Sequence, residues 1–469
     1  MLRATVDTLA QVTAGTLVRG EGTVTVNGIA VDSREVTPGC LYVAFLGEHS
    51  DGHDFVAAAL AAGARAAMVT RWDEAMETAV VEARRPDAAI IRIGDPLVAV
   101  SALAAWHRSR LDTPVIGITG STGKTTTKDF IASALATKLK VVATRGNRNN
   151  ELGVPLTLLE AGSDTDVVVV EMGMRGPGQI AALCKIAAPT AALVTNVGMT
   201  HIEVLGSQEA IVDAKAEIVR CIGPGGRVFL NGDDVHSARL AEQAVAPVVT
   251  YGVESGDDVR AVGLRVGEDG LPTFTLQSGE EAAELTLPIP GRHNAYNAAA
   301  AAAVALYLGL SLKDIAEGLA SARTTGMRME VFSSASGVTV INDAYNASPT
   351  SMRAALATLR DMPAEGRRIA VLGDMAELGS LSELAHFGLG ELVPKCADVL
   401  VTIGTCAWRI AEGARAEDMP SAMVRPCATI EEATEVLDDL LAPGDVVLVK
   451  ASRVMQLERV VEGIINPNV

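Results

Sequence analysis

The chain has few aromatic residues, a deficit of basic residues and no long apolar run, and each shortage excludes a class of protein. Aromatic residues make up 3% of the 469 residues and hydrophobic residues 49%, so the cores must be built mainly from Ala, Val, Leu and Ile. A net charge of −18, from 39 basic and 57 acidic residues, argues against a general nucleic-acid or anionic-membrane binder. The alanine-rich runs at 57–62 and 298–303 are too short to span a bilayer, so we expect no stable membrane insertion.

Paired cysteines and a secretion signal are also missing. The six cysteines are scattered, without a CxxC motif or metal-type spacing, which is typical of free thiols in a reducing compartment. The N-terminus has neither the basic region nor the apolar core of a signal peptide. We therefore expect a cytoplasmic protein, and we expect it to be a monomer.

The most informative pattern lies at residues 115–127, Val-Ile-Gly-Ile-Thr-Gly-Ser-Thr-Gly-Lys-Thr-Thr-Thr. A β-branched strand leads into a glycine-rich turn and then a helix, so backbone N–H groups and the positive helix end point at one place, a cradle for phosphate. Lys124 would reach the β- and γ-phosphates and the Thr125 hydroxyl would bind Mg²⁺. Ile118 stands where the strict Walker pattern has glycine, so this is a variant loop. An ordinary strand–turn–helix is the alternative, but the pattern favours binding of ATP or GTP.

Apolar strands alternate with helical segments along the chain, which indicates an α/β fold. We predict three domains: a smaller N-terminal α/β domain (1–112), a central domain with a doubly wound, mostly parallel sheet and the P-loop (113–326), and a C-terminal Rossmann-like α/β domain (327–469). A hinge is predicted at 323–330. Strands are expected at 115–118, 141–143, 166–171, 191–195 and 227–230, in an antiparallel edge patch over 248–289, and near 338–342, 368–372, 398–403 and 445–449.

Polar residues follow several predicted strands, where open α/β sheets bind their ligands. Glu171 ends the strand at 166–171 and is placed to hold Mg²⁺ with Thr125, the alternative being a solvated acid. His201 lies in a glycine-containing loop after the next strand, where its imidazole could bind a second metal instead of serving the fold. Asp343 follows a strand of the third domain and could accept hydrogen bonds from ribose hydroxyls.

Lys215 lies in an amphipathic helix predicted over 207–220. Ile211, Lys215 and Ile218 are spaced by four and three, so the lysine shares a face with apolar residues. Taken alone it is most simply a lysine whose stem is buried and whose amine reaches solvent. Near a metal site, a lysine of lowered pKa could instead react with CO₂ and become an anion, a choice that spacing leaves open.

Two further polar segments could meet an anionic substrate. Ser33 and Arg34, after a strand of the first segment, offer a hydroxyl and a guanidinium for a diphosphate or nucleoside. The loop 146–150, Gly-Asn-Arg-Asn-Asn, offers several amides, among them Asn149, for a phosphate or carboxylate. A plain turn is the equal alternative for that loop.

Taken together, these motifs resemble the Mur ligases, the ATP-dependent amide-forming enzymes of peptidoglycan precursor synthesis, over essentially the whole chain. The P-loop alone is shared with other ligases, including folylpolyglutamate synthases. Asp32-Ser33-Arg34 and Asp51-Gly-His-Asp-Phe resemble the UDP-binding domain of the third- and fourth-step enzymes. Tyr345-Asn-Ala-Ser-Pro349 and Leu372-Gly-Asp-Met-Ala-Glu-Leu-Gly379 resemble members that add D-alanyl-D-alanine to UDP-N-acetylmuramoyl-tripeptide. Ser348 and Ala451 are small departures, at positions where Asn and Gly are commoner.

The resemblance implies roles for individual residues. Lys124, Lys215 and His201 would be catalytic, with Lys215 matching the family's carbamylated lysine; Thr125, Glu171 and His201 would organise Mg²⁺; and Ser33, Arg34 and Asn149 would bind the substrate. ATP would be held by Gly120, Ser121, Thr122, Gly123, Lys124, Thr125 and Thr126, with Asn294, Arg328 and Asp343 at its adenosine and phosphate end.

The implied reaction transfers the γ-phosphoryl of ATP to a carboxylate, and the resulting acyl phosphate is attacked by the amine of D-alanyl-D-alanine. The runner-up is a third-step ligase that adds diaminopimelate or lysine to UDP-N-acetylmuramoyl-dipeptide, although its Asn-Pro-Arg signature is missing. A nucleotide-gated scaffold has no need of the charged set Glu171, His201 and Lys215. A small-molecule phosphotransferase does not explain the UDP-type first segment.

Overall fold

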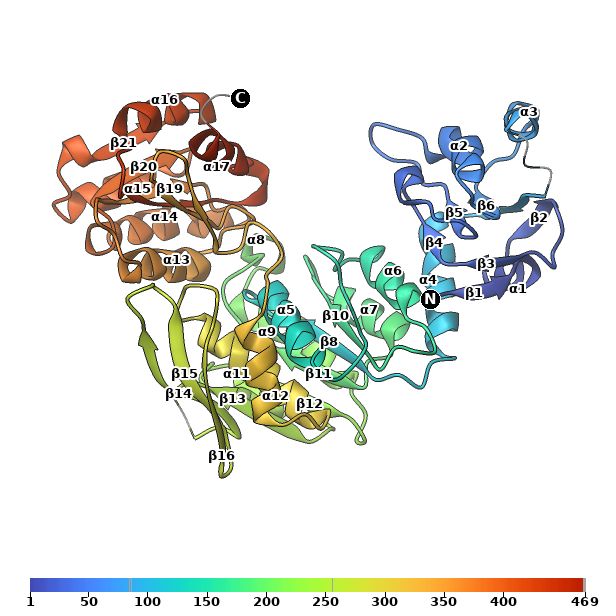
Figure 1. Ribbon diagram of the computed structural model, residues 1–469, viewed down its shortest axis with the longest axis horizontal. Coiled ribbons are helices and arrows are strands. Elements are labelled where there is room, and N and C mark those ends of the chain that lie inside the picture. The colour runs from blue at the N-terminus through green and yellow to red at the C-terminus, as the bar shows by residue number, and fades with distance from the viewer. Residues whose placement is uncertain (84, 86, 255, 467–469) are drawn as a thin grey trace. The chain divides into compact units, whose positions relative to one another are not determined.

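The computed structural model describes residues 1–83, 85, 87–254 and 256–466. Within them, sheets of two, five, nine and six strands alternate with helices, so the expected α/β class is confirmed (Figure 1). Contacts between Cα atoms divide the chain into two compact units: Met1–Gly117, Leu139–Gly173 and Ile180–Ala191 form the first, and Ile118–Lys138, Met174–Gln179 and Ala192–Val469 form the second. No helix of the described ranges is both long and apolar enough to cross a membrane.

The N-terminal part of the first unit has a five-stranded sheet in the order β2-β7-β6-β5-β4 and a two-stranded ribbon of β1 and β3. Strands β4 to β7 are parallel and β2 is antiparallel to β7. Tyr42, Leu60 and Ile90 belong to its buried core. The elements are β1 (Arg3–Thr5), α1 (Val6–Val12), β2 (Thr16–Arg19), β3 (Thr25–Asn27), β4 (Ile29–Ala30), β5 (Leu41–Val43), α2 (Val56–Ala61), β6 (Ala66–Val69), α3 (Glu74–Glu82), β7 (Ala89–Arg92) and α4 (Pro96–Arg108).

The nine-stranded sheet has the order β16-β15-β14-β13-β12-β11-β8-β10-β9. Its five strands expected before residue 248 are all present, and β9 has the expected bounds. The strands and helices up to that residue are β8 (Val115–Thr119), α5 (Lys124–Leu135), β9 (Val141–Ala143), α6 (Gly153–Glu160), β10 (Val167–Glu171), α7 (Gln179–Ala187), β11 (Ala191–Val194), α8 (Ile202–Leu205), α9 (Gln208–Arg220), β12 (Arg227–Asn231) and α10 (Ser237–Ala241).

The expected antiparallel patch over 248–289 is correct only in part. Strand β13 (Val248–Gly252) runs parallel to β12 and to β14 (Val259–Val266), so it continues the parallel sheet. The antiparallel part begins where β14 pairs with β15 (Pro272–Ser278), which pairs with β16 (Glu281–Thr286). The apolar and polar alternation of this segment therefore indicated strands correctly but not the direction of the first one.

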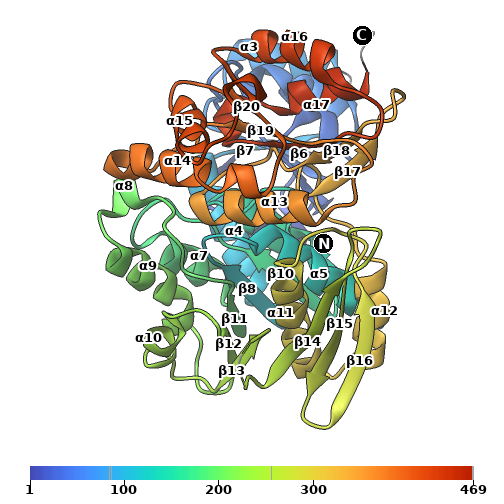
Figure 2. The same ribbon diagram turned by 90° about the vertical axis from the view of Figure 1, so that its left-hand side faces the viewer.

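Helices α11 (Asn294–Tyr307) and α12 (Leu312–Ala320) pack against α5 and against the strands β13 to β16 (Figure 2). The run Ala298–Ala303 is buried, because small side chains let a helix lie close to its neighbours. Gly318 shows the same close packing: a Cβ there would lie 2.6 Å from the carbonyl oxygen of Ser133 in α5. The aromatic-poor composition is thus used for close helix packing.

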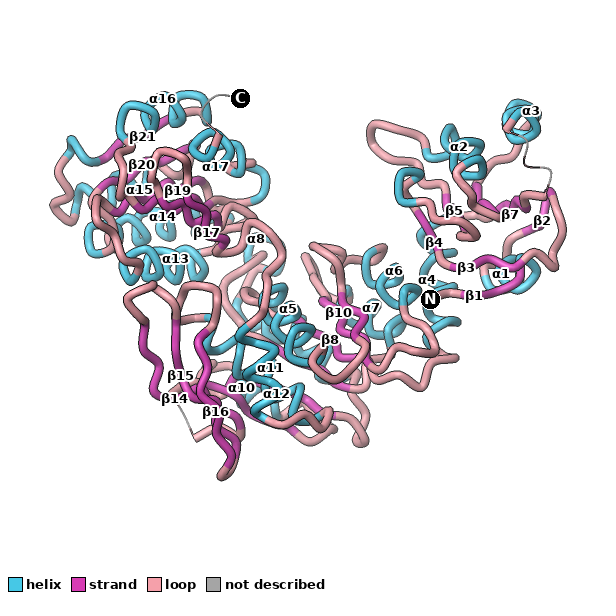
Figure 3. The backbone as a smooth tube through the Cα atoms, in the orientation of Figure 1, coloured by secondary structure: helices cyan, strands magenta, loops and turns pink. Residues whose placement is uncertain are grey.

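The C-terminal sheet has the order β17-β18-β22-β19-β20-β21, with β17 antiparallel to β18 and the other pairs parallel. Leu437 of α16 and Val460 and Ile464 of α17 belong to the buried core of this sheet. Figure 3 shows these two helices beside the strands. The elements are β17 (Glu330–Ser333), β18 (Thr339–Asn342), α13 (Pro349–Asp361), β19 (Arg368–Gly373), α14 (Ser382–Gly390), β20 (Val399–Ile403), α15 (Trp408–Ala416), β21 (Val424–Cys427), α16 (Ile430–Leu440), β22 (Val446–Lys450) and α17 (Glu458–Ile465).

Candidate active site

The glycine-rich loop between β8 and α5 requires glycine at two positions. Gly120 has φ +149°, and a Cβ there would lie 1.8 Å from Oγ1 of Thr195. Gly123 has φ +78°, a left-handed conformation, and its Cβ would lie 2.7 Å from Oδ1 of Asn297. The loop can therefore lie close to its neighbours only without side chains at these residues.

The residues just after β11 hold this loop in shape. The side chain of Asn196 accepts from the backbone N–H of Thr122 at 3.0 Å and donates to its carbonyl oxygen at 3.1 Å. The hydroxyl of Thr195 donates to the same carbonyl at 2.6 Å. Ser121 Oγ donates to the carbonyl of Gly198 at 2.9 Å. These contacts fix the direction of the loop's backbone groups, which is what a phosphate cradle needs.

Lys124 is the first residue of α5, and its ammonium donates to the carbonyl oxygen of Gly120 at 2.8 Å. Its side chain therefore curls back along the loop. No side chain caps the N-terminus of α5 in the described structure, and Thr125 in its first turn is buried. Helix N-termini carry donor N–H groups and a partial positive charge, so this end of α5 can bind an anion.

Asn294 lies behind the loop and uses its amide within the protein. It donates to the carbonyl oxygen of Pro290 at 2.8 Å and accepts from Asn297 at 2.9 Å. Asn297 in turn accepts from the hydroxyl of Thr127 in α5 at 3.1 Å. Asn294 is thus linked to the nucleotide loop through Asn297, a residue that the sequence patterns did not single out.

His201 follows β11 in a left-handed conformation with φ +57°. Its Nδ1 is hydrogen-bonded to Oε2 of Glu377, a residue of the segment between β19 and α14. Burial lowers the pKa of His201; Glu377 acts against this, whereas the charges of Lys124 and Lys215 add to it. The imidazole is therefore held towards its neutral form.

Lys215 lies in α9, whose first turn is capped by Ser207. The residue is buried like Ile211 and Ile218, as its spacing indicated, but its amine does not reach solvent. Burial lowers the pKa of Lys215 well below its ordinary value; the charge of Lys124 adds to this and that of Asp234 opposes it. The burial excludes the interpretation in which the Lys215 amine reaches solvent. A neutral amine is a nucleophile, so the alternative in which Lys215 reacts with CO₂ stays open.

Glu171 ends β10 in the first compact unit and is buried. Its Oε1 accepts from Nδ2 of Asn149 at 2.7 Å, and its backbone N–H donates to the hydroxyl of Thr144 at 3.0 Å. The predicted substrate residue Asn149 and the predicted metal ligand Glu171 are therefore neighbours.

Ser33 and Arg34 form a short 3₁₀ turn in the same unit, with Asp32 as its cap. The guanidinium of Arg34 is exposed and pairs with Asp32, Nη2 to Oδ2 at 2.5 Å. The side-chain hydrogen bond from Arg34 is the main cause that lowers the pKa of Asp32 to about 2. Glu35 of this turn pairs with Arg148 at 3.0 Å, so the two predicted substrate segments are joined.

Asp343 and Arg328, both assigned to the nucleotide by the resemblance, have separate partners. Asp343 pairs with the buried ammonium of Lys450 at 2.5 Å, and Lys450 also donates to the carbonyl oxygen of Asn346 at 2.8 Å. The guanidinium of Arg328 lies 4.1 Å from the ring centroid of Tyr345. The structure brings both side chains to the start of the C-terminal sheet but not into contact with each other.

No group of three or more His, Cys, Asp or Glu residues in the described part of the chain could by itself hold a metal ion. Mg²⁺, however, needs few protein ligands, because it keeps several waters and is completed by substrate phosphates. The carboxylate of Glu171 and the hydroxyl of Thr125 have the oxygen chemistry that Mg²⁺ prefers. The nitrogen of His201 suits Mg²⁺ less well, and its Nδ1 is engaged by Glu377.

Family models match most of the chain in three successive segments. "Mur ligase family, catalytic domain" covers residues 25–108, "Mur ligase middle domain" covers 118–305, and "Mur ligase, glutamate ligase domain" covers 327–453. The chain belongs to the Mur ligase family, a family of ATP-dependent ligases, which confirms the resemblance inferred from its motifs.

Within that family, its relatives include one particular enzyme from several bacteria. UDP-N-acetylmuramoyl-tripeptide–D-alanyl-D-alanine ligase of Bacillus subtilis is 37% identical over 99% of both chains, and that of Escherichia coli is 36% identical over 83% of each. Among solved structures, MurF from Acinetobacter baumannii has a TM-score of 0.85 and 31% identity over 99% of both chains. MurF of Thermotoga maritima in complex with ADP has a TM-score of 0.76 and 30% identity, over 93% of this chain and 96% of that one.

Proposed function

We propose that this chain joins D-alanyl-D-alanine to UDP-N-acetylmuramoyl-tripeptide with the conversion of ATP to ADP and phosphate, a step of peptidoglycan precursor synthesis. The observation that carries the proposal is the 37% identity, over 99% of both chains, with the Bacillus subtilis ligase of that name. The P-loop, with two glycines that its neighbours require and Lys124 at the start of α5, supports the use of a nucleotide triphosphate. We further propose a monomeric cytoplasmic enzyme with domains at 1–112, 113–326 and 327–469.

The reaction overcomes the low reactivity of a carboxylate. Loop residues Gly120 to Thr126 bind the ATP phosphates through backbone N–H groups, and Lys124 leaves its contact with the Gly120 carbonyl for the phosphates. Its charge offsets the negative charge that develops as the γ-phosphoryl moves to the tripeptide carboxylate. The amine of D-alanyl-D-alanine then attacks the acyl phosphate, and phosphate leaves from the tetrahedral intermediate.

Thr125 and Glu171 are proposed to hold Mg²⁺, with His201 as a further ligand once it parts from Glu377. The bound ion would neutralise charge on the phosphates and the acyl acceptor. Asn149 orients the Glu171 carboxylate by its 2.7 Å hydrogen bond and offers its remaining groups to substrate.

Lys215 is proposed to attack CO₂ through its neutral amine and, with release of one amine proton, to become a carbamate. The buried position and lowered pKa of this lysine support the proposal, because a protonated amine cannot attack CO₂. The carbamate anion would be attracted by the positive charge of Lys124, whereas a protonated Lys215 would be repelled by it.

The remaining predicted residues are proposed to act at the ends of the two substrates. Ser33 and Arg34 would bind the uridine diphosphate, with the guanidinium of Arg34 turning from Asp32 to a phosphate. Arg328 and Asp343 would hold adenosine and ribose. Asn294 would act on the nucleotide through Asn297, because both of its amide groups are used within the protein.

Phosphate release by the purified chain tests this function. With UDP-N-acetylmuramoyl-tripeptide and ATP, we expect release to require D-alanyl-D-alanine and the uridylated product to gain the dipeptide. Diaminopimelate and lysine, offered with UDP-N-acetylmuramoyl-dipeptide, should give no product. Release with a diamino acid alone would assign the third step instead, and ADP formation without any extended sugar-peptide would contradict both.

A further inference from the structure

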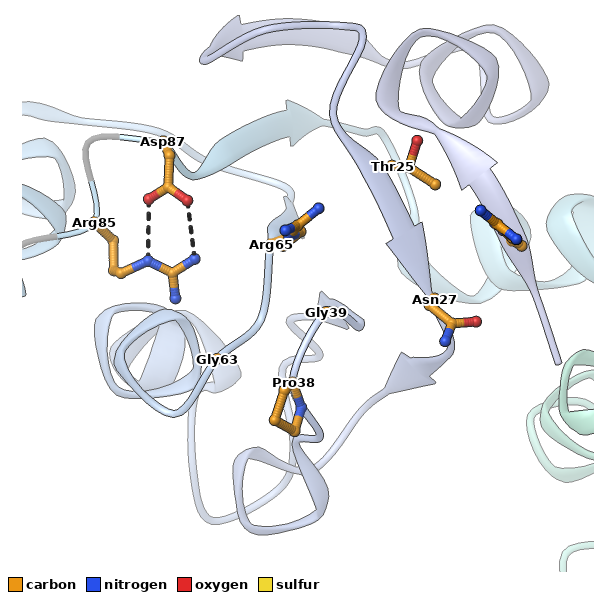
Figure 4. Close-up of a pocket in the computed structure, with 9 residues that line it drawn as sticks. Thr25, Asn27, Pro38, Gly39, Gly63, Arg65, Arg85 and Asp87 are labelled. Atoms are coloured by element: carbon orange, nitrogen blue, oxygen red, sulfur yellow. Dashed lines mark hydrogen bonds and ion pairs between the residues drawn. The ribbon is translucent and has the colours of Figure 1, made fainter.

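A basic pocket lies in the N-terminal part of the first unit, at the edge opposite Ser33 and Arg34. Its volume is about 720 Å³, within the range of small-molecule sites. Ser33 and Arg34 follow the carboxyl end of β4, whereas Gly39, Arg65 and Asp87 precede the amino ends of the neighbouring strands β5, β6 and β7. The lining residues are Arg3, Thr25, Asn27, Pro38, Gly39, Gly63, Arg65, Arg85 and Asp87 (Figure 4).

The ribbon of β1 and β3 gives the pocket its polar wall. Arg3 is directly opposite Asn27 in the antiparallel register, and both are exposed. The alternate residues Ala4 and Val26 are buried in the core. Because successive side chains of a strand point to opposite faces, the ribbon presents an arginine and an amide on the same side.

Three guanidinium groups and one carboxylate line the pocket, in a chain whose net charge is −18. Arg85 pairs with Asp87, Nε to Oδ1 at 3.1 Å (Figure 4). Its Nη1 also donates to the carbonyl oxygen of Leu60. Arg3 and Arg65 make no side-chain hydrogen bond or ion pair with any described residue. The pocket therefore has an excess of positive charge that the protein does not neutralise itself.

Part of the pocket is lined by the backbone of Gly39, which has no side chain. Gly39 has φ +91°, and a Cβ there would meet no atom within 4 Å, so a side chain would enter open space. Its backbone is fixed on both sides, since Gly39 N–H donates to the Gly63 carbonyl and Asn27 N–H donates to the Gly39 carbonyl, both at 2.8 Å. The space beside Arg3 and Arg65 is thus kept open by a rigid turn.

We propose that this pocket binds a small anion of the phosphate or diphosphate class, at a site separate from the reaction. Arg3 and Arg65 would supply charge-assisted, fork-shaped donors to the phosphate oxygens. Thr25 and Asn27 would supply neutral donors from the ribbon. The Arg85–Asp87 pair closes the third side.

Pyrophosphate binding to the full chain tests the site. Pyrophosphate also suits the P-loop and the proposed diphosphate site at Arg34. All binding is therefore measured in a Lys124→Ala/Arg34→Gln background, by titration at constant ionic strength with NaCl as the reference salt. We expect Arg3→Gln with Arg65→Gln to raise the pyrophosphate Kd at least tenfold. Arg92→Gln, an exposed arginine at the carboxyl end of β7, is the matched control and should leave that Kd unchanged.

A second variant tests the pocket even if the Arg3→Gln/Arg65→Gln variant fails to fold. Asn27→Asp adds one carboxylate to the exposed face of the ribbon and should weaken pyrophosphate and inorganic phosphate alike, with an unchanged melting temperature of the unliganded protein. Equal binding by the Arg3/Arg65 variant, or stabilisation by NaCl equal to that by pyrophosphate, would overturn the proposal.

Measuring ligase turnover separates anion binding in this pocket from the proposed reaction. With Lys124 and Arg34 intact, the Arg3→Gln/Arg65→Gln variant should form product at the wild-type rate, because neither Arg3 nor Arg65 belongs to the proposed reaction site. Loss of pyrophosphate binding with full turnover supports the pocket. A parallel loss of turnover would instead place these arginines in substrate binding and overturn the separate site.

Discussion

Oδ1 of Asn297 accepts a hydrogen bond from the hydroxyl of Thr127 at 3.1 Å, and the same oxygen lies 2.7 Å from the point that a Cβ of Gly123 would occupy. One amide of α11 therefore contacts both the last loop residue and the first turns of α5. Asn294, behind it, fixes its orientation. The nucleotide loop is thus shaped by a helix about 170 residues further along the chain.

We expect Gly123→Ala to weaken ATP binding at least tenfold. Its left-handed φ of +78° costs a non-glycine residue about 1–2 kcal/mol, and the new Cβ would displace Asn297. Nucleotide affinity is measured by titration calorimetry. Gly309→Ala, also left-handed at φ +88° but in open space, should leave the affinity unchanged. Equal affinities for both variants would show that the contact with Asn297 is irrelevant to the nucleotide.

Lys124→Ala should lower turnover by at least about 10²-fold, because it removes a positive charge that stabilises the transition state. The rate is measured by phosphate release at saturating substrates. Lys138→Ala, which removes an exposed lysine paired with Asp314, is the control and should act at the wild-type rate. Near-normal turnover of the Lys124 variant would refute its proposed role.

Lys215→Ala should lose most activity and regain part of it with formate or acetate, which can occupy the space of the missing carbamate. Lys215→Arg fills that space and stays charged, so short carboxylates should not restore it. In the wild-type protein, ¹³C-labelled CO₂ should give a carbamate NMR signal that is absent from Lys215→Ala. Full activity of Lys215→Ala would leave the residue a lysine of the core; Lys185→Ala, at an exposed position, serves as the control.

Local sequence patterns predicted many of the strands and helices, but they did not predict which distant side chains contact each other. The apolar run at 141–143 gave β9 its observed bounds, and the helix with Lys215 begins one residue after its Ser207 cap. Strand β21 was missed because exposed Arg425 and Pro426 interrupt its pattern. The pairing of His201 with Glu377 joins residues 176 positions apart, and that of Asp343 with Lys450 joins residues 107 apart. Such distant contacts depend on the packed sheets and leave no periodic signal in the sequence.

Asp343→Ala should destabilise the protein by about 3 kcal/mol, because it leaves the ammonium of Lys450 buried without its carboxylate. Urea unfolding without nucleotide measures this separately from any role in binding. The double variant Asp343→Ala/Lys450→Met should recover much of the loss, since no buried charge remains. Glu284→Ala breaks the exposed pair with Arg265 and should cost less than about 1 kcal/mol. Equal costs at both sites would contradict a role for burial.

His293 gives the protein a stability that depends on pH. Burial lowers its pKa to about 4, with Lys450 acting in the same direction and Asp343 against it. Between pH 6.5, the ordinary histidine value, and pH 4, the unfolded chain therefore binds a proton at this ring that the folded chain does not. Stability conferred by the neutral ring is complete above pH 6.5 and falls as the pH drops to 4, by at most about 3 kcal/mol.

His293→Gln removes this ring and should flatten the difference between stability at pH 7 and at pH 4.5, measured as urea midpoints for wild type and variant across that range. Because Asp343 and Lys450 remain, the rest of the acid sensitivity should persist. His49→Gln, at an exposed position, should reproduce the wild-type curve. Parallel curves for wild type and His293→Gln would mean that this partly buried ring carries no proton linkage, since a lowered pKa must steepen the wild-type curve in this window.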